Sequence, residues 1–328
     1  MSWSSLLKQN IPNADNPPVQ FVKATPQKLI SRLERVGFIN SKNDCFFHVV
    51  LQLLLTVPKF NWDLNHAICK EIFKLRNEIY ESQAPVFPSK LHELINNKFP
   101  QFLQMQQDVT ECFYMIIDML HEELKESTNH PVNGEEDWLE IGYKSKAIQK
   151  RLYSFHNSPM RCFYGQCCTA ILKKNKISAK SIEPFLFLSV ELFDSLATTM
   201  NKYSFSNFKN NENTWFESLP EVLTIQFLRF TYHKQRGLSK NKRMADYPNS
   251  LPVPCGSEGK ATIYNYRLYG VIYHIGDTIE CGHYTVALYD LKLGNWVYID
   301  DEHVIKVSQQ EVLKTRRDEA YMLMYVRQ

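Results

Sequence analysis

The spacing of apolar positions changes near the middle of the chain. Within residues 106–125, apolar side chains fall at i, i+3, i+4, i+7, i+8, i+11 and i+15 from Val109, with acidic residues off this stripe. This pattern predicts an amphipathic helix. Residues 46–55 are apolar on nearly every side and are followed by Pro58, which favours a buried helix. The chain up to about residue 150 is therefore expected to be mainly helical.

After this point the apolar period becomes two. Leu223, Ile225 and Phe227 alternate with polar neighbours, as in a half-buried strand. Further strands rich in Tyr, Val, Ile and Leu are predicted at 265–275, 283–290, 295–300 and 319–327. Helices and strands in separate blocks indicate the α+β class rather than alternating α/β.

Composition narrows the class of protein. The 328 residues are 44% apolar and 22% charged, as in a globular domain, and a net charge of +3 is too small to indicate a nucleic-acid partner. No apolar run approaches the roughly 18 residues of a membrane span. Residues 1–29 are polar and contain prolines, so we expect a flexible leader before one folded unit, 30–328. Eight cysteines without a signal-peptide pattern favour the cytoplasm or nucleus.

Three residues far apart in the sequence have the chemistry of a cysteine hydrolase. Cys45 opens the predicted buried helix, where the helix dipole favours a thiolate. His283 follows Gly282 and begins a predicted strand, and Asp300 ends the next strand. These residues supply a nucleophile, a base and a carboxylate that fixes the imidazole tautomer. Asp301 is the rival for the third role, but strand alternation is expected to point the two carboxylates to opposite faces.

Residues near this triad have predicted supporting roles. Asn40 can supply a side-chain amide to an oxyanion, beside the Cys45 backbone N–H, although read alone it is a turn residue. Asp44 is placed to cap the helix with its carboxylate, and its charge is expected to oppose thiolate formation. Cys281 could form a disulfide with Cys45 under oxidation.

The cysteines give no clear metal signal. None of the eight forms a C-x-x-C pair, which is the strongest zinc pattern. Cys162, Cys167 and Cys168 with His156 could be a metal cluster, but small hydrophobic residues on a strand are the favoured interpretation. We therefore expect no structural metal and no other cofactor.

Five blocks of the sequence, in order, resemble the ubiquitin-specific protease family of deubiquitinating enzymes. The resemblance covers nearly everything from about residue 33 to 328. The blocks are the cysteine box at 40–52, a Q-Q-D block at 106–113, a strand at 219–230, the histidine box at 282–284 with 296–301, and the closing strand at 320–325.

The resemblance implies a papain-like core, with a helical thumb at about 33–150 and fingers and an antiparallel palm at about 151–328. It implies a thiol-dependent deubiquitinase that cleaves the isopeptide or peptide bond after the C-terminal glycine of ubiquitin. It assigns the triad to Cys45, His283 and Asp300, and the oxyanion donor to Asn40. It places substrate-binding residues at Gln106, Asp108, Glu111, Gly282 and Tyr284, with Asp108 gripping the arginine-bearing ubiquitin tail.

The sequence also departs from the family pattern. Lys42 stands where the family has glycine, Asp44 where it has threonine, and His48 where it has asparagine. The four zinc cysteines of the fingers are missing, and only a short link joins Val190 to Leu219, so we expect shortened, metal-free fingers. Two alternatives stay open: a protease for another ubiquitin-like modifier, and a catalytically weak or inactive ubiquitin-binding scaffold.

Overall fold

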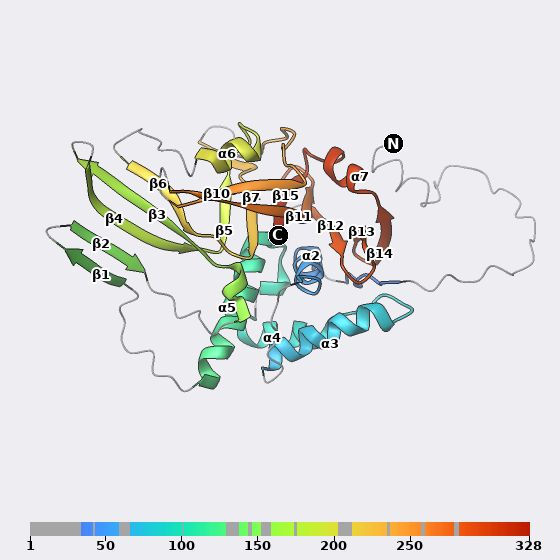
Figure 1. Cartoon of the computed structure of the whole chain (residues 1–328). Coiled ribbons are helices and arrows are strands. Elements are labelled where there is room, and N and C mark those ends of the chain that lie inside the picture. Colours follow the sequence, from blue (N-terminus) through green and yellow to red (C-terminus); the bar gives the residue numbers. More distant parts are fainter. Residues whose placement is uncertain are drawn as a thin grey trace, which may run out of the picture.

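The computed structural model describes most of the chain beyond its first 33 residues. The described ranges are 34–41, 43–58, 66–100, 102–128, 138–143, 146–151, 159–173, 176–202, 212–234, 237–256, 260–278 and 282–328. The leader expected at 1–29, Lys42, His156 and Cys281 lie outside these ranges. Helices gather below a large central sheet, and a smaller sheet extends to one side (Figure 1). The class is therefore α+β, as the sequence predicts.

The helical part surrounds one fully buried helix. It comprises α2 (Cys45–Leu54), α3 (Ala67–Glu81), α4 (Ser89–Lys98), η1 (Phe102–Gln104) and α5 (Val109–Thr128). All ten residues of α2 are buried, which explains its apolar sequence on every side. It packs between α5 and the central sheet, and the predicted apolar stripe of α5 faces the core. The helical part ends at α5, earlier than the predicted residue 150.

The large sheet has eight strands. Its order is β14-β13-β12-β11-β15-β7-β5, with β10 paired to β11, and only β5 and β7 are parallel neighbours. The strands are β5 (Phe187–Val190), β7 (Val222–Phe227), β10 (Ser250–Cys255), β11 (Thr262–Ile275), β12 (His283–Asp290), β13 (Asn295–Asp300), β14 (His303–Val307) and β15 (Ala320–Arg327). The strands predicted around 223–227 and at 265–275, 283–290, 295–300 and 319–327 lie in this sheet and are confirmed.

The smaller sheet forms an arm in the order β1-β2-β4-β3-β6. Its strands are β1 (Trp138–Tyr143), β2 (Lys146–Arg151), β3 (Gly165–Lys173), β4 (Lys176–Phe185) and β6 (Glu212–Ser218). Elements outside both sheets are η3 (Pro159–Phe163), α6 (Leu196–Lys202), the hairpin β8 (Phe230–His233) and β9 (Gly237–Lys240), and α7 (Gln309–Lys314). Because β1 and β2 join this arm, the predicted boundary at 150 falls inside a sheet.

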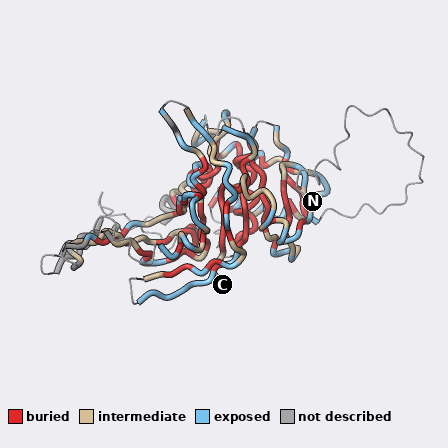
Figure 2. The backbone as a smooth tube through the Cα atoms, turned by 90° about the horizontal axis from the view of Figure 1, so that it is seen from above, coloured by how far each residue is buried: buried red, intermediate tan, exposed pale blue. Residues whose placement is uncertain are grey.

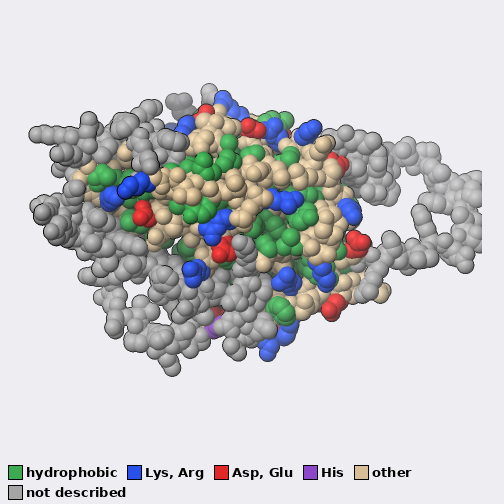
Figure 3. Space-filling view, in the orientation of Figure 1, with side chains coloured by type: hydrophobic (Ala, Val, Ile, Leu, Met, Phe, Trp, Pro, Cys, Tyr) green, Lys and Arg blue, Asp and Glu red, His purple; other side chains and the backbone are tan. Residues whose placement is uncertain are grey.

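The core lies where the large sheet meets the helices. Figure 2 shows buried positions concentrated in this region, and the described positions of the arm add a small cluster around Cys168 and Trp215. On the face seen in Figure 3, Lys and Arg side chains are scattered among hydrophobic ones. Within the described ranges, no helix is long and apolar enough to cross a membrane.

A buried ion pair fastens the chain before α2 to the end of β12. Arg35 Nη1 lies 2.5 Å from Asp290 Oδ2, and both side chains have no exposed surface. Tyr80 of α3 donates its hydroxyl to the same oxygen at 2.7 Å, and Arg35 also donates to the Gln52 side chain. This network joins α2, α3 and the sheet, and so fixes the helices relative to β12.

Replacing Arg35 with methionine should destabilise the fold strongly. Arg35→Met leaves the Asp290 carboxylate buried without its cation, so the free energy of unfolding should fall by about 3–5 kcal/mol in urea denaturation. Arg35→Met with Asp290→Leu should cost less than the sum of the two single changes. Lys90→Met, which breaks an exposed pair with Glu93, is the control and should cost within about 1 kcal/mol. A loss from Arg35→Met as small as this control would contradict the interpretation.

Candidate active site

Cys45 is the first residue of α2 and is only 3% exposed. The preceding Asn43 has a left-handed backbone (φ 62°), which turns the chain into the helix. Asp44 then donates its backbone N–H to Asn40 Oδ1 at 3.0 Å, which fixes the approach to the nucleophile. The thiol therefore sits at the positive end of the helix dipole, where an anion is stabilised.

His283 begins β12, whose neighbours in the sheet are β11 and β13. Its Nε2 lies 2.7 Å from Asp300 Oδ1, at the end of β13. Hydrogen bonds to Asp300 and to Cys45 raise the pKa of His283 to about 10, although burial alone would lower it. At neutral pH the ring is therefore held as an imidazolium beside Cys45, the partner that a thiolate needs.

Asp301 lies closer to this histidine than strand alternation predicts. Its Oδ2 is 3.8 Å from His283 Nε2, so both carboxylates face the ring, and the expectation of opposite faces is wrong. The reason is that β13 ends at Asp300, and Asp301 leaves the strand in a left-handed conformation (φ 49°). Only Asp300 comes within hydrogen-bonding distance of the imidazole.

Asp301 also holds the segment that leads to the nucleophile. Its Oδ2 accepts from Asn40 Nδ2 at 3.0 Å, and its carbonyl accepts from the Phe38 N–H at 2.9 Å. A Cβ at Gly37 would lie 2.1 Å from the same carbonyl oxygen, so only glycine fits there. Burial raises the pKa of Asp301, but the His48 and Asn40 side chains outweigh it, and the pKa is lowered overall. An ionised Asp301 thus orients Asn40.

Asn40 has one side-chain N–H that its bond to Asp301 does not use. A side-chain amide has two N–H groups, and only one of them is needed for the bond to Asp301. Its oxygen accepts the Asp44 N–H, so the amide is fixed at both ends. The second N–H is the donor that the predicted oxyanion role of Asn40 would require.

Gln106 is hydrogen-bonded to the backbone of Gly282, the residue before His283. Its Nε2 donates to the Gly282 carbonyl at 2.6 Å, and its Oε1 accepts from the Gly282 N–H at 3.4 Å. A Cβ at Gly282 would lie 2.2 Å from His274 Nε2, so this close packing requires glycine. Both residues, predicted to bind substrate, are thus tied to each other beside His283.

The other predicted substrate residues lie at the start of α5 and in β12. Asp108 Oδ1 accepts the Thr110 N–H at 2.7 Å, and its Oδ2 accepts the Tyr321 hydroxyl, so Asp108 caps α5 while staying partly exposed. Glu111 is exposed in the first turn. Tyr284 is fully buried against Tyr321, so its side chain does not face a substrate in this structure.

The prediction that the Asp44 carboxylate caps α2 is wrong. Its backbone (φ −87°, ψ 14°) lacks the extended conformation of a capping residue, and no side-chain capping bond forms. The Asp44 carbonyl instead accepts the N–H groups of Phe47 and His48. The carboxylate turns toward His92 of α4, with 3.6 Å between Oδ2 and Nε2. His92 lies in no motif, so only the fold reveals this contact.

The cysteines considered as an alternative metal cluster lie in environments that raise their pKa values. Burial raises the pKa of Cys162 to about 12, of Cys167 to about 11 and of Cys168 to about 12. Cys167 and Cys168 lie in β3, as the strand interpretation predicts, whereas Cys162 lies in η3. Among the residues that the structure describes, two other groups have metal-ligand spacing: His283, Asp300 and Asp301, and Asp44, His48 and His92.

Known proteins share this sequence pattern and fold. Ubiquitin carboxyl-terminal hydrolase 10-B of Xenopus laevis is 23% identical over 415 residues, covering 98% of this chain and 51% of the frog protein. Ubiquitin hydrolase B of Dictyostelium discoideum is 25% identical, covering 71% of this chain and 58% of that protein. The chain thus spans about half the length of these relatives.

A solved structure has the same fold. The SAGA Ubp8/Sgf11/Sus1/Sgf73 DUB module bound to ubiquitin aldehyde contains a chain with a TM-score of 0.71 and 21% identity. The match covers 92% of this protein and 72% of that chain. Residues 36–325 also match the sequence model of ubiquitin carboxyl-terminal hydrolases. Because that match covers nearly the whole chain, including α2 with Cys45 and both sheets, the protein belongs to the ubiquitin carboxyl-terminal hydrolase family.

Proposed function

We propose that the protein is a thiol-dependent deubiquitinase that hydrolyses the isopeptide or peptide bond after the C-terminal glycine of ubiquitin. The observation that carries this proposal is the His283 imidazole, which lies 2.7 Å from Asp300 Oδ1 and whose pKa is raised by Asp300 and by Cys45. Family membership supports ubiquitin as the substrate. The fold supports the thumb for α2 to α5, the palm for the large sheet and the fingers for the arm.

The arrangement supports a two-step reaction. The Cys45 thiolate attacks the scissile carbonyl, and the oxyanion accepts from the Cys45 backbone N–H and the second N–H of Asn40. The His283 imidazolium gives its proton to the leaving amine, and the C–N bond breaks to leave a thioester. Neutral His283 then takes a proton from water, whose oxygen attacks the thioester. Collapse of the second tetrahedral intermediate releases the carboxylate and returns the thiolate–imidazolium pair.

The N-terminal end of α5 is the proposed grip on the ubiquitin tail. Asp108 is partly exposed there, and Glu111 is exposed one turn further on. The oxygens of Asp108 already accept from Thr110 and Tyr321, but a carboxylate has about four acceptor sites. It can therefore still bind an arginine-bearing tail by charge-assisted hydrogen bonds. The eight cysteines of the chain favour a reducing compartment, so cytoplasm or nucleus remains our proposal for location.

Covalent capture by a ubiquitin probe tests the proposal most broadly. The full chain should form a stoichiometric adduct with ubiquitin carrying a C-terminal electrophile, seen by intact mass, and Cys45→Ala should form none. If only the probe of another ubiquitin-like modifier is captured, that modifier and not ubiquitin is the substrate. Ubiquitin binding without any capture would show a scaffold instead of an enzyme, and either result contradicts the proposal.

The two adjacent aspartates should have separable effects on kcat/KM with a ubiquitin C-terminal reporter. Asp300→Asn removes the carboxylate bonded to His283 and should lower kcat/KM by about 10²-fold or more. Asp301→Asn weakens the hold on Asn40 and should cost less, because the imidazole keeps its partner. Circular dichroism spectra of both variants control for folding. A larger loss in Asp301→Asn than in Asp300→Asn would reverse the assignment.

A further inference from the structure

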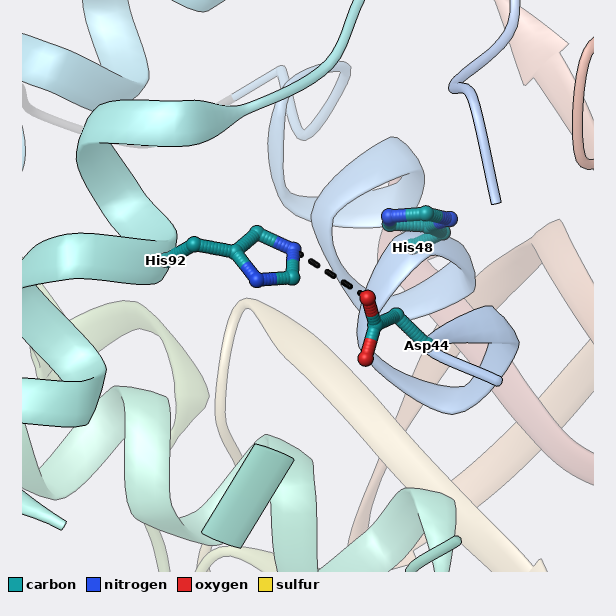
Figure 4. Close-up of side chains that lie close together, drawn as sticks. All are labelled: Asp44, His48 and His92. Carbon is teal, nitrogen blue, oxygen red and sulfur yellow. Dashed lines mark ion pairs between the residues drawn. The ribbon is translucent and has the colours of Figure 1, made fainter. Parts of the chain in front are cut away.

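A second group of ionisable side chains lies beside the nucleophile, outside the triad. Asp44 and His48 are one helical turn apart at the start of α2, and His92 reaches them from α4. Figure 4 shows the His92 ring directed at the Asp44 carboxylate, with the His48 ring one turn further along the same helix. One ligand atom from each lies within 4.8 Å of the others. All three are buried, with 0%, 2% and 6% exposure respectively.

The His48 ring is buried, and both of its nitrogens lack a hydrogen bond within the described parts of the chain. Burying such atoms unpaired is costly, because they lose their hydrogen bonds to water. His48 Nδ1 lies 3.9 Å from Asp301 Oδ1, an oxygen that also has no hydrogen-bond partner among the described residues. The ring is therefore placed between a carboxylate on one side and the Asp44–His92 pair on the other.

This placement is typical of a metal-binding histidine. A ligating imidazole binds the metal through one nitrogen and donates its other N–H to a carboxylate, which fixes the ring. Asp301 is placed to be that carboxylate for His48. Two imidazoles and one carboxylate suit zinc and related divalent metals, with a further position left for water.

The walls of the group are apolar and hold the rings. Phe38 packs 5.4 Å from the His48 ring, and Phe47 and Phe87 pack 5.1 and 4.8 Å from the His92 ring, measured between centroids. Such walls exclude water and preset the ring orientations. Cys45 lies about 100° further around the helix and hydrogen-bonds to His283 instead, so it is not a ligand.

Two of the three ligands are positions where this chain departs from the family pattern, which has threonine and asparagine in place of Asp44 and His48. We propose that Asp44, His48 and His92 form a binding site for a divalent transition metal of the zinc class. The site does not depend on the proposed hydrolysis. The proposal runs against the expectation of no metal, which rested on the spacing of cysteines alone.

Zinc binding to full-length Cys45→Ala protein tests the site, because that change removes the reactive thiol. Competition with a chromophoric chelator should show one zinc per chain. Cobalt should give visible d–d bands without a sulfur charge-transfer band. His48→Asn, Asp44→Thr and His92→Gln, each made in the Cys45→Ala chain, should weaken zinc binding by about tenfold or more. The first two restore residues that the family carries, so they should keep the fold.

Two further variants separate this site from other histidines. His283→Gln removes the histidine of the catalytic group, and His303→Gln removes an exposed one, so both should leave zinc affinity unchanged. Absence of one-to-one binding in folded Cys45→Ala protein would show that the group is only a buried ion pair, and would overturn the proposal. The proposal would also be overturned if all three ligand variants bound zinc as tightly as the Cys45→Ala parent, or if His283→Gln lost zinc binding.

Discussion

The active site depends on keeping an imidazolium beside Cys45. That cation exists at neutral pH because Asp300 accepts a hydrogen bond from the ring at 2.7 Å and Cys45 accepts another, which together outweigh the cost of burial. Both partners come from other elements, α2 and the end of β13. The fold therefore has to bring a helix N-terminus and two strand ends to one point and hold them there.

Two sets of contacts achieve this. On one side, the Gln106 side chain hydrogen-bonds to both the N–H and the carbonyl of Gly282, which sets the start of β12. On the other, the turn after β13 is pinned to the segment before α2 by Asp301, through its carbonyl and its carboxylate. The left-handed conformation of Asp301 is the local strain that this clamp requires. It allows one turn to orient Asn40 and to leave Asp300 for His283.

The sequence predicts the elements that carry the site because their patterns are strong. Residues 283–290 and 295–300 read as strands, and the helix at Cys45 is apolar on every side, so these assignments are confirmed. Features that depend on backbone dihedrals or long-range packing could not be read in the same way. Strand alternation fails at Asp301 because the strand ends one residue earlier, and the Asp44 cap fails because its backbone is not extended. His92 joins Asp44 and His48 only through the packing of α4, which no local pattern encodes.

The central claim is the charge state of His283, and its own titration tests it most directly. NMR of ring-labelled histidine should show His283 remaining protonated through neutral pH, with a pKa of about 10. In Asp300→Asn the pKa should move down toward the ordinary 6.5, because the strongest partner of the cation is lost. The raised value means that the imidazolium persists as pH rises through 7 and is lost only as pH approaches 10. A ring that titrates near 6.5 in the parent protein, or one unmoved by Asp300→Asn, would contradict this account of the site.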